Sequence, residues 1–266
     1  AYLTKPFEIS LRSNGTKLYG LNRSSGGGGT LSGRYVYTWN LSTPFDITTA
    51  SWASKAFDLS PHGLSTPSGM AWNSTGTQFC VVDDSNGNIR LFTASTSWDV
   101  RTLALTSSSN LPNAYTNAVD CEFINNDTEI AVLSTQGKIR KQSLPSLANI
   151  SSSVLDLSTV SGFPTGQSWE GMFVNAAGNK LLVANSTGDY VVEMDFATPY
   201  DFQSISTVNQ SINVNSLIGP TNDNRGQAKI YNNSLYLDRT NWYTTGLYVS
   251  SPNVNCHYRM YRITLN

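Results

Sequence analysis

Carboxyl, basic and aromatic side chains that could act in catalysis or binding recur near the start of successive hairpin-like segments of this 266-residue chain. Glycoside hydrolysis needs two carboxyl groups held several ångströms apart, one of them a general acid. Glu8, Asp120 and Glu170 would form such a set if the segments that carry them surround one axis. The alternative is a polar channel in which these groups pair with one another, for instance Arg225 with Glu170. We favour the polar channel, because no catalytic signature accompanies the carboxylates. Further residues expected in the channel are His62, Ser68, Glu122, Trp169, Asp223 and Gln227.

A second group of candidate binding residues lies in the segment Arg239–His257, where aromatic residues stand among Asn, Ser and Thr. Such a surface suits sugars, on which a ring stacks, and it also suits protein interfaces, where aromatics anchor the contact. A third interpretation is that the rings pack the segment onto the body of the protein. The residues predicted to bind a ligand are Trp242, Tyr243, Tyr248, Arg239, Trp169, Glu170, Arg225 and Asp120, and none is predicted to be catalytic.

Metal and cofactor patterns are weak. The two histidines lie far apart in sequence, and Cys80, Cys121 and Cys256 match no metal spacing. Cys80 and Cys121 stand in apolar runs, so we expect small core residues. Asp84–Asn88 lacks the closing glutamate of a calcium loop and is expected to be a turn. A lactonase-type alternative would require a divalent cation held by Glu170, Asp120 and Asn222. We predict no metal and no cofactor.

The elements that must position these residues are marked by a sequence motif, called the phrase below, that occurs four times. Leu41–Ile47 (LSTPFDI) returns as Ala94–Val100 (ASTSWDV) and Phe196–Phe202 (FATPYDF), with a degenerate copy at Leu144–Ile150 (LPSLANI). The copies are about fifty residues apart, a period typical of a repeated supersecondary unit. We expect the aspartate of each copy to accept backbone N–H groups in a turn, and the aromatic residue before it to pack between neighbouring units. A ring of ligand-binding carboxylates at Asp46, Asp99 and Asp201 is the less favoured alternative.

Each unit also contains a hairpin pattern, two apolar runs around a polar turn. With a strand before the phrase and one after it, each unit has the four strands of a propeller blade. We therefore predict an all-β protein, a single five-bladed β-propeller of four-stranded antiparallel blades, occupying residues 1–266. The N-terminal strand is expected to join the last blade and close the ring; a six-bladed ring with a partner-supplied blade stays open. The hairpins are Phe7–Leu21, Met70–Val82, Cys121–Leu133, Met172–Ala184 and Ala228–Asp238, and the blades are roughly 5–60, 61–113, 114–164, 165–219, and 220–266 with 1–4.

Two predicted loops are longer than the others. Arg23–Arg34 and Arg239–His257 connect the second and third strands of the first and fifth units. In a closed ring these units are neighbours, so we expect the loops to form one shared binding edge.

Composition excludes several classes of function. Charged residues make up 13% of the chain and the net charge is −1, so no polybasic surface for nucleic acid or anionic lipid is expected. No run approaches eighteen apolar residues, so we expect no membrane insertion. The first residues, AYLTKPFEISL, show no signal-peptide pattern. We expect either that a leader was removed or that the protein reaches the exterior within a particle.

The phrase, together with the hairpin turn Asn14–Tyr19 (NGTKLY), resembles the propeller repeat of marine bacteriophage tail-fibre and virion-surface proteins, and of related bacterial surface proteins. The resemblance implies a propeller at a virion surface, with a host glycan or protein as the partner. It carries no functional residue over. The expected function is that of an adhesin or receptor-binding protein, with contacts to other virion subunits and a homo-oligomer compatible with the sequence. The alternatives are a secreted hydrolase, glycosidase or lactonase-like, that uses channel carboxylates, and a structural decoration protein.

Overall fold

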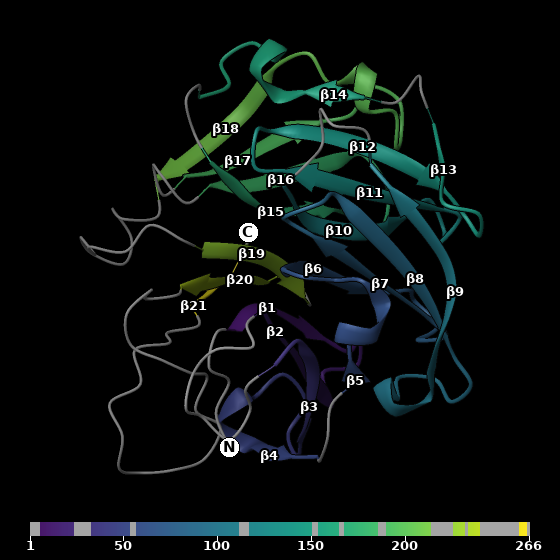
Figure 1. Ribbon diagram of the computed structural model, residues 1–266. Helices are drawn as coiled ribbons and strands as arrows, with labels where there is room; N and C mark the ends of the chain where they lie inside the picture. The colour runs from purple at the N-terminus through teal and green to yellow at the C-terminus, as the bar shows by residue number, and fades with distance from the viewer. Residues whose placement is uncertain are drawn as a thin grey trace.

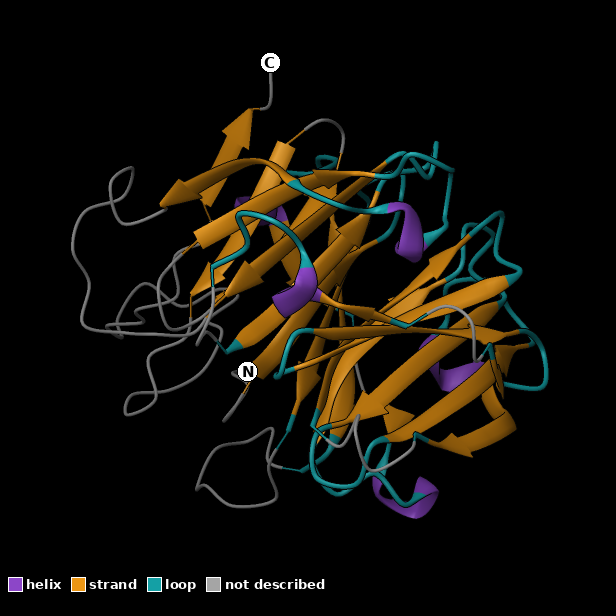
Figure 2. Cartoon of the chain, turned by 90° about the horizontal axis from the view of Figure 1, so that it is seen from above, coloured by secondary structure: helices purple, strands orange, loops and turns teal. Residues whose placement is uncertain are grey.

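The computed structural model describes residues 6–23, 33–53, 57–111, 117–150, 154–164, 168–185, 190–213, 226–231, 234–239 and 261–264. These residues form antiparallel sheets joined by single-turn 3-10 helices (Figures 1 and 2). The β-propeller architecture expected from the repeats is thereby confirmed.

Four sheets are complete blades of at least four strands, each built from consecutive strands. The first blade contains β1 (Pro6–Leu11), β2 (Lys17–Asn22), β3 (Tyr35–Leu41), β4 (Ala50–Trp52) and β5 (Phe57–Asp58). The second contains β6 (Pro67–Trp72), β7 (Gln78–Asp83), β8 (Asn88–Ala94) and β9 (Leu103–Asn110). The third contains β10 (Ala118–Ile124), β11 (Glu129–Ser134), β12 (Lys138–Ser143), β13 (Ala148–Asn149) and β14 (Leu155–Asp156). The fourth contains β15 (Trp169–Val174), β16 (Lys180–Asn185), β17 (Tyr190–Asp195) and β18 (Val208–Asn213).

The prediction of five four-stranded blades is wrong, because the described residues form four complete blades. A further sheet has three strands, β19 (Gly226–Tyr231), β20 (Ser234–Arg239) and β21 (Tyr261–Thr264). Counting hairpins overestimated the number of blades. The phrase that turns the chain from the third strand into the outer one occurs only four times, and it is the phrase that marks a complete blade.

The first strands of the sheets surround the axis of the molecule. β1 contacts β6, β6 contacts β10, and β10 contacts β15, while β19 contacts both β15 and β1 (Figure 1). β1 pairs with β2 in its own blade. The predicted closing strand, Ala1–Thr4, and most of the two long loops lie outside the described residues.

Apolar side chains fill the seams between the sheets. One cluster joins Tyr19 and Leu21 of the first blade to Phe79 of the second, and similar clusters join the second blade to the third and the third to the fourth. The second strand of each blade has neighbours on both faces, which explains continuous apolar runs such as that of β16. The buried free thiols Cys80 and Cys121 belong to these clusters, as predicted.

The repeated phrase is part of the scaffold, as predicted. Its aspartates cap the 3-10 helices: Asp46 accepts a hydrogen bond from Thr48 N, Asp99 from Arg101 N and Asp201 from Gln203 N. The helices of the described chain are η1 (Ile47–Thr49), η2 (Ser60–His62), η3 (Val100–Thr102), η5 (Leu157–Thr159) and η6 (Phe202–Ser204).

The aromatic residue of the phrase covers the hairpin glycine of its own blade, and Trp98 also packs between blades, as expected, in the cluster that contains Tyr19. Trp98 donates its backbone N–H to the carbonyl of Gly76, and its indole lies where a Cβ on Gly76 would be, 2.3 Å away. Gly76 has a positive φ of 69°, which favours glycine. Phe45 and Tyr200 cover the corresponding glycines of the first and fourth blades. Trp98 also reaches the first blade, because its carbonyl accepts a hydrogen bond from Tyr19 Oη at 2.8 Å.

The degenerate copy of the phrase behaves differently. Asn149 lies in the short strand β13, where its Oδ1 accepts a hydrogen bond from Gln142 Nε2. The carboxylate that caps a 3-10 turn in this blade is Asp156, which accepts from Ser158 N. The substitution of Asn for Asp therefore coincides with a cap that is displaced to Asp156.

Candidate functional site

The innermost strands of all four blades carry a β-bulge at the same place. The register shifts between Pro6 and Glu8 in β1, and at equivalent positions in β6, β10 and β15. The residue that follows each bulge is Glu8, Gly69, Asp120 or Gly171 in blade order. A carboxylate thus alternates with a glycine around the axis. This alternation is visible only when the four innermost strands are compared.

Both of these carboxylates tie neighbouring blades together. Asp120 is fully buried; its Oδ2 accepts a hydrogen bond from Met172 N of the next blade at 2.7 Å and its Oδ1 from Cys121 N at 2.8 Å. Glu8 is also fully buried and accepts a hydrogen bond from Met70 N of the second blade. A buried carboxylate that accepts hydrogen bonds from backbone N–H groups is held in one geometry.

The glycine of the second blade permits close approach. A Cβ on Gly69 would lie 2.6 Å from Asp120 Cα and 2.8 Å from the carbonyl oxygen of Val119. The residue before it, Ser68, donates its hydroxyl to the carbonyl of Ala118 in the third blade. Polar groups at this end of the innermost strands therefore connect one blade to the next.

The other predicted site residues divide into two groups. Trp169 is only 3% exposed and its ring packs on Phe163 at 4.6 Å, inside the cluster that joins the third and fourth blades. Glu170 is 5% exposed and lies at the bulge of β15, where its Oε1 accepts a 3.4 Å hydrogen bond from Ser168. Trp242, Tyr243, Tyr248 and Arg225 lie outside the described residues, and Arg239 is described only as the end of the backbone of β20. The shared loop edge remains a prediction.

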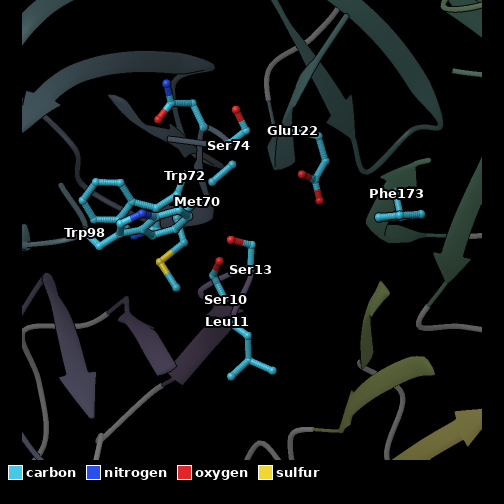
Figure 3. Close-up of a pocket in the computed structure, with 11 residues that line it drawn as sticks. Ser10, Leu11, Ser13, Met70, Trp72, Ser74, Trp98, Glu122 and Phe173 are labelled. Atoms are coloured by element: carbon cyan, nitrogen blue, oxygen red, sulfur yellow. The ribbon is translucent and has the colours of Figure 1, made fainter. Parts of the chain in front are cut away.

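A pocket of about 160 Å³ lies on the axis at the opposite end of the innermost strands, where the chain enters the hairpin turns. All four blades contribute to it, as Figure 3 shows with Glu122 and Phe173 across from Trp72 and Trp98. The residues that line it are Ser10, Leu11, Ser13, Met70, Ala71, Trp72, Asn73, Ser74, Trp98, Glu122 and Phe173.

The pocket walls combine aromatic rings with hydroxyl groups. Trp72 and Trp98 lie against each other, with ring centroids 5.5 Å apart, and Phe173 is half-buried on the other side. Ser10 and Ser13 supply hydroxyls from β1 and its turn. Glu122 on β10 is the one carboxylate among the described lining residues. Trp72 and Trp98 are buried in the wall, so the half-buried ring of Phe173 is the one that can stack on a sugar, while the serine hydroxyls can bond its hydroxyl groups.

The rim of the pocket is held in place by turn-to-turn contacts. Asp127, in the hairpin turn of the third blade, accepts hydrogen bonds from the backbone N–H and the hydroxyl of Ser74. Asn73 bonds the backbone of its own turn through Oδ1, at 2.8 Å to Thr77 N and 2.9 Å to Gln78 N. The lining is therefore preorganised on two adjacent blades, which lowers the entropy cost of binding.

Sequence reasoning identified only one residue of this pocket, Glu122, as a channel residue. It placed the binding surface at the long loops or at the channel mouth and named other channel residues, so Ser10, Trp72 and Phe173 were missed. The sequence did contain a signal for these pocket residues, because residues two positions apart on an innermost strand share one face of the sheet. Ser10 lies two residues after Glu8 and Glu122 two after Asp120. The alternation alone does not show at which end of the innermost strands the pocket lies.

Two further classes of site have no support in the described part of the chain. Among those residues, no group of three or more His, Cys, Asp and Glu side chains is placed to hold a metal ion. The helices there are single turns, and none is long and apolar enough to cross a bilayer. His62 packs against Phe57 and Phe92, with ring centroids 5.3 and 5.0 Å away, and burial lowers its pKa below the ordinary value of 6.5.

Fold and pocket together define the class as a β-propeller with an axial pocket. No family model matches the sequence. No curated protein matches it. Among solved structures, the chain is similar to a Bacteroides fragilis protein provisionally assigned as a 6-phosphogluconolactonase. The TM-score is 0.53 at 12% identity over 89% of this chain, and the match spans 64% of the other chain. This likeness supports the propeller fold alone.

Proposed function

We propose that this propeller is a glycan-binding protein and that the axial pocket takes one sugar unit of the glycan. The observation that carries the proposal is the lining of the pocket, where aromatic rings, serine hydroxyls and a single carboxylate converge from four blades. Hydrolysis of a glycoside requires a second carboxyl group near the first. Glu8 and Asp120, which lie on innermost strands as Glu122 does, are fully buried and hold backbone N–H groups of neighbouring blades. Binding without turnover therefore fits the described groups better.

The setting that the repeat resemblance suggests is a receptor-binding protein at a virion surface. A pocket of this size gives weak binding to one sugar, and many copies on a particle would raise the total affinity by avidity. The partner would be a host surface glycan, and the protein would act outside the cell.

The proposal is tested with a glycan array followed by calorimetry on the hits. Phe173→Ala removes a half-buried ring from the pocket wall and is expected to weaken binding about tenfold. Ser13→Trp fills the pocket from an exposed turn position and is expected to abolish binding. Ser206→Trp, at an exposed position before β18 and outside the pocket lining, is the matched control and should bind like the wild type. Array signals that survive Ser13→Trp would refute the pocket as the binding site.

A lactonase is the second candidate, favoured by the fold of the Bacteroides fragilis protein and by the carboxylate of Glu122 in the pocket. In that role Glu122 would act as a general base toward water, the one such group among the described lining residues. The test is hydrolysis of 6-phosphogluconolactone by the wild type and by Glu122→Gln. Turnover that the substitution abolishes would establish the enzyme and displace the binding proposal.

A further inference from the structure

A concentration of positive charge borders the axial pocket at the seam between the first and second blades. Arg12 lies in the hairpin turn after β1, and its guanidinium carbon is 5.4 Å from the centroid of the Trp98 ring. Lys17 begins β2 and donates from Nζ to the carbonyl of Trp98 at 3.1 Å. Arg101 of η3 binds Asp99 through Nε at 2.8 Å and Nη2 at 2.5 Å.

The charges in this cluster do not balance. Three cations and one carboxylate leave two positive charges (3 − 1 = 2) in a chain whose net charge is −1 and whose charged residues are few. Asp99 is occupied by Arg101 through two hydrogen bonds, and this contact lowers the pKa of Asp99. With the carboxylates of the described chain, neither Arg12 nor Lys17 forms an ion pair. Mutual repulsion between these cations would be relieved by an anion.

The state of Lys17 agrees with this charge imbalance. Burial lowers the pKa of Lys17; Asp99 opposes the shift, while Arg12 and Arg101 add to it. A bound anion would raise the pKa of Lys17.

The cations reach the wall of the pocket, because both contact Trp98, which lines it. Arg12 stands between Leu11 and Ser13, both of which line the pocket, and it stacks on Trp98, which lines it as well. Lys17 and Arg12 approach Trp98 from the first blade. Glu122 reaches the pocket from the third blade, as Figure 3 shows. A ligand can therefore place a neutral edge near Glu122 and a charged substituent near Arg12.

We propose that Arg12 and Lys17 form an anion subsite for a sulfate, carboxylate or phosphate group on the sugar bound in the axial pocket. The inference rests on the proposed glycan-binding function and specifies its ligand as an anionic sugar. A guanidinium offers a planar pair of donors that matches the oxygens of all three groups, and the lysine adds a point charge. The ring of Trp98 holds the guanidinium in place, so less side-chain freedom is lost on binding.

The test uses four sugars that differ only at one carbon: galactose, galactose 6-sulfate, galactose 6-phosphate and galacturonic acid. Their affinities for the wild type, Arg12→Ala and Arg12→Ala/Lys17→Ala are measured by titration followed by NMR. At least one charged sugar is expected to bind the wild type tenfold or more tightly than galactose. The double variant should lose that advantage while its affinity for galactose stays within about twofold. The charged sugar that loses most identifies the preferred anion.

Lys138→Ala is the matched control, because it removes one positive charge at the start of β12. This position lies on the face of the propeller opposite the turns that join the first and second strands of each blade. It should bind all four sugars like the wild type. Equal loss in Lys138→Ala would indicate long-range attraction and overturn the subsite. Galactose binding as tightly as its charged derivatives would overturn the subsite but leave the proposed function standing. Absence of binding by all four sugars at millimolar concentration would overturn both.

Discussion

The buried carboxylate of Asp120 gives the most direct test of the interior. In Asp120→Ala, two backbone N–H groups, those of Cys121 and Met172, lose the acceptors that lie 2.8 and 2.7 Å away. The site is fully buried, so water does not replace them without rearrangement. Each unsatisfied buried donor costs about 1–3 kcal/mol, which gives about 2–6 kcal/mol for the pair. Typical domains have about 5–15 kcal/mol of stability, so the loss is a large part of the total.

The assay is urea unfolding at neutral pH, followed by thermal unfolding. A loss near 3 kcal/mol corresponds to a decrease in Tm of about 6–12 °C for a domain of this size. Asp120→Asn retains one acceptor oxygen and should lose about half as much. Asp195→Ala is the control, because Asp195 is an exposed carboxylate, 55% accessible, paired with Lys180, and its loss should change stability by less than about 1 kcal/mol.

A loss below about 1 kcal/mol in Asp120→Ala would refute the structural role of this carboxylate. Catalytic carboxylates are commonly held at a cost in stability, so an unchanged or more stable variant would instead favour a functional role. The same measurement therefore separates the binding propeller from the channel hydrolase.

Three further outcomes are expected. Gly76→Ala should lower the free energy of unfolding by about 1–3 kcal/mol, because the added Cβ would lie 2.3 Å from the indole of Trp98. Gly162 also has a positive φ, but a Cβ there would lie 3.7 Å from its nearest neighbour, so Gly162→Ala should lower the free energy of unfolding by less in the same assay. The free energy of unfolding should fall as the pH drops below 6.5, because burial lowers the pKa of His62 and the unfolded chain therefore binds the proton first. In His62→Gln, unfolding curves measured at about pH 7 and about pH 5 should differ less than those of the wild type. Burial raises the pKa of the Cys121 thiol, so thiol reagents should modify it only after unfolding; reaction in the native protein, detected by mass spectrometry, would contradict its placement in the core.

The sequence by itself determined the repeated unit and its local turns. The phrase recurs because each blade must turn its chain from the third strand to the outer one, and an aspartate beside a 3-10 turn satisfies backbone donors locally. The hairpins were equally predictable, since apolar runs around a polar turn depend on neighbours in sequence. The number of complete blades was not predictable from hairpins, because the outer strand needs partners that a local pattern does not specify.

Only the tertiary structure decided which polar residues tie blades together and which line the pocket. Glu8 and Asp120 are of a residue type that often acts in catalysis. At the bulges of the innermost strands, however, their carboxylates accept hydrogen bonds from backbone N–H groups of the next blade. The pocket at the other end exists because Ser10, Glu122 and Phe173 come from three different blades and meet on the axis. Their separation in sequence is large, and only the packing of blade against blade brings them together. Arg12 and Lys17 acquire their common site in the same way, when the first blade meets the indole of the second.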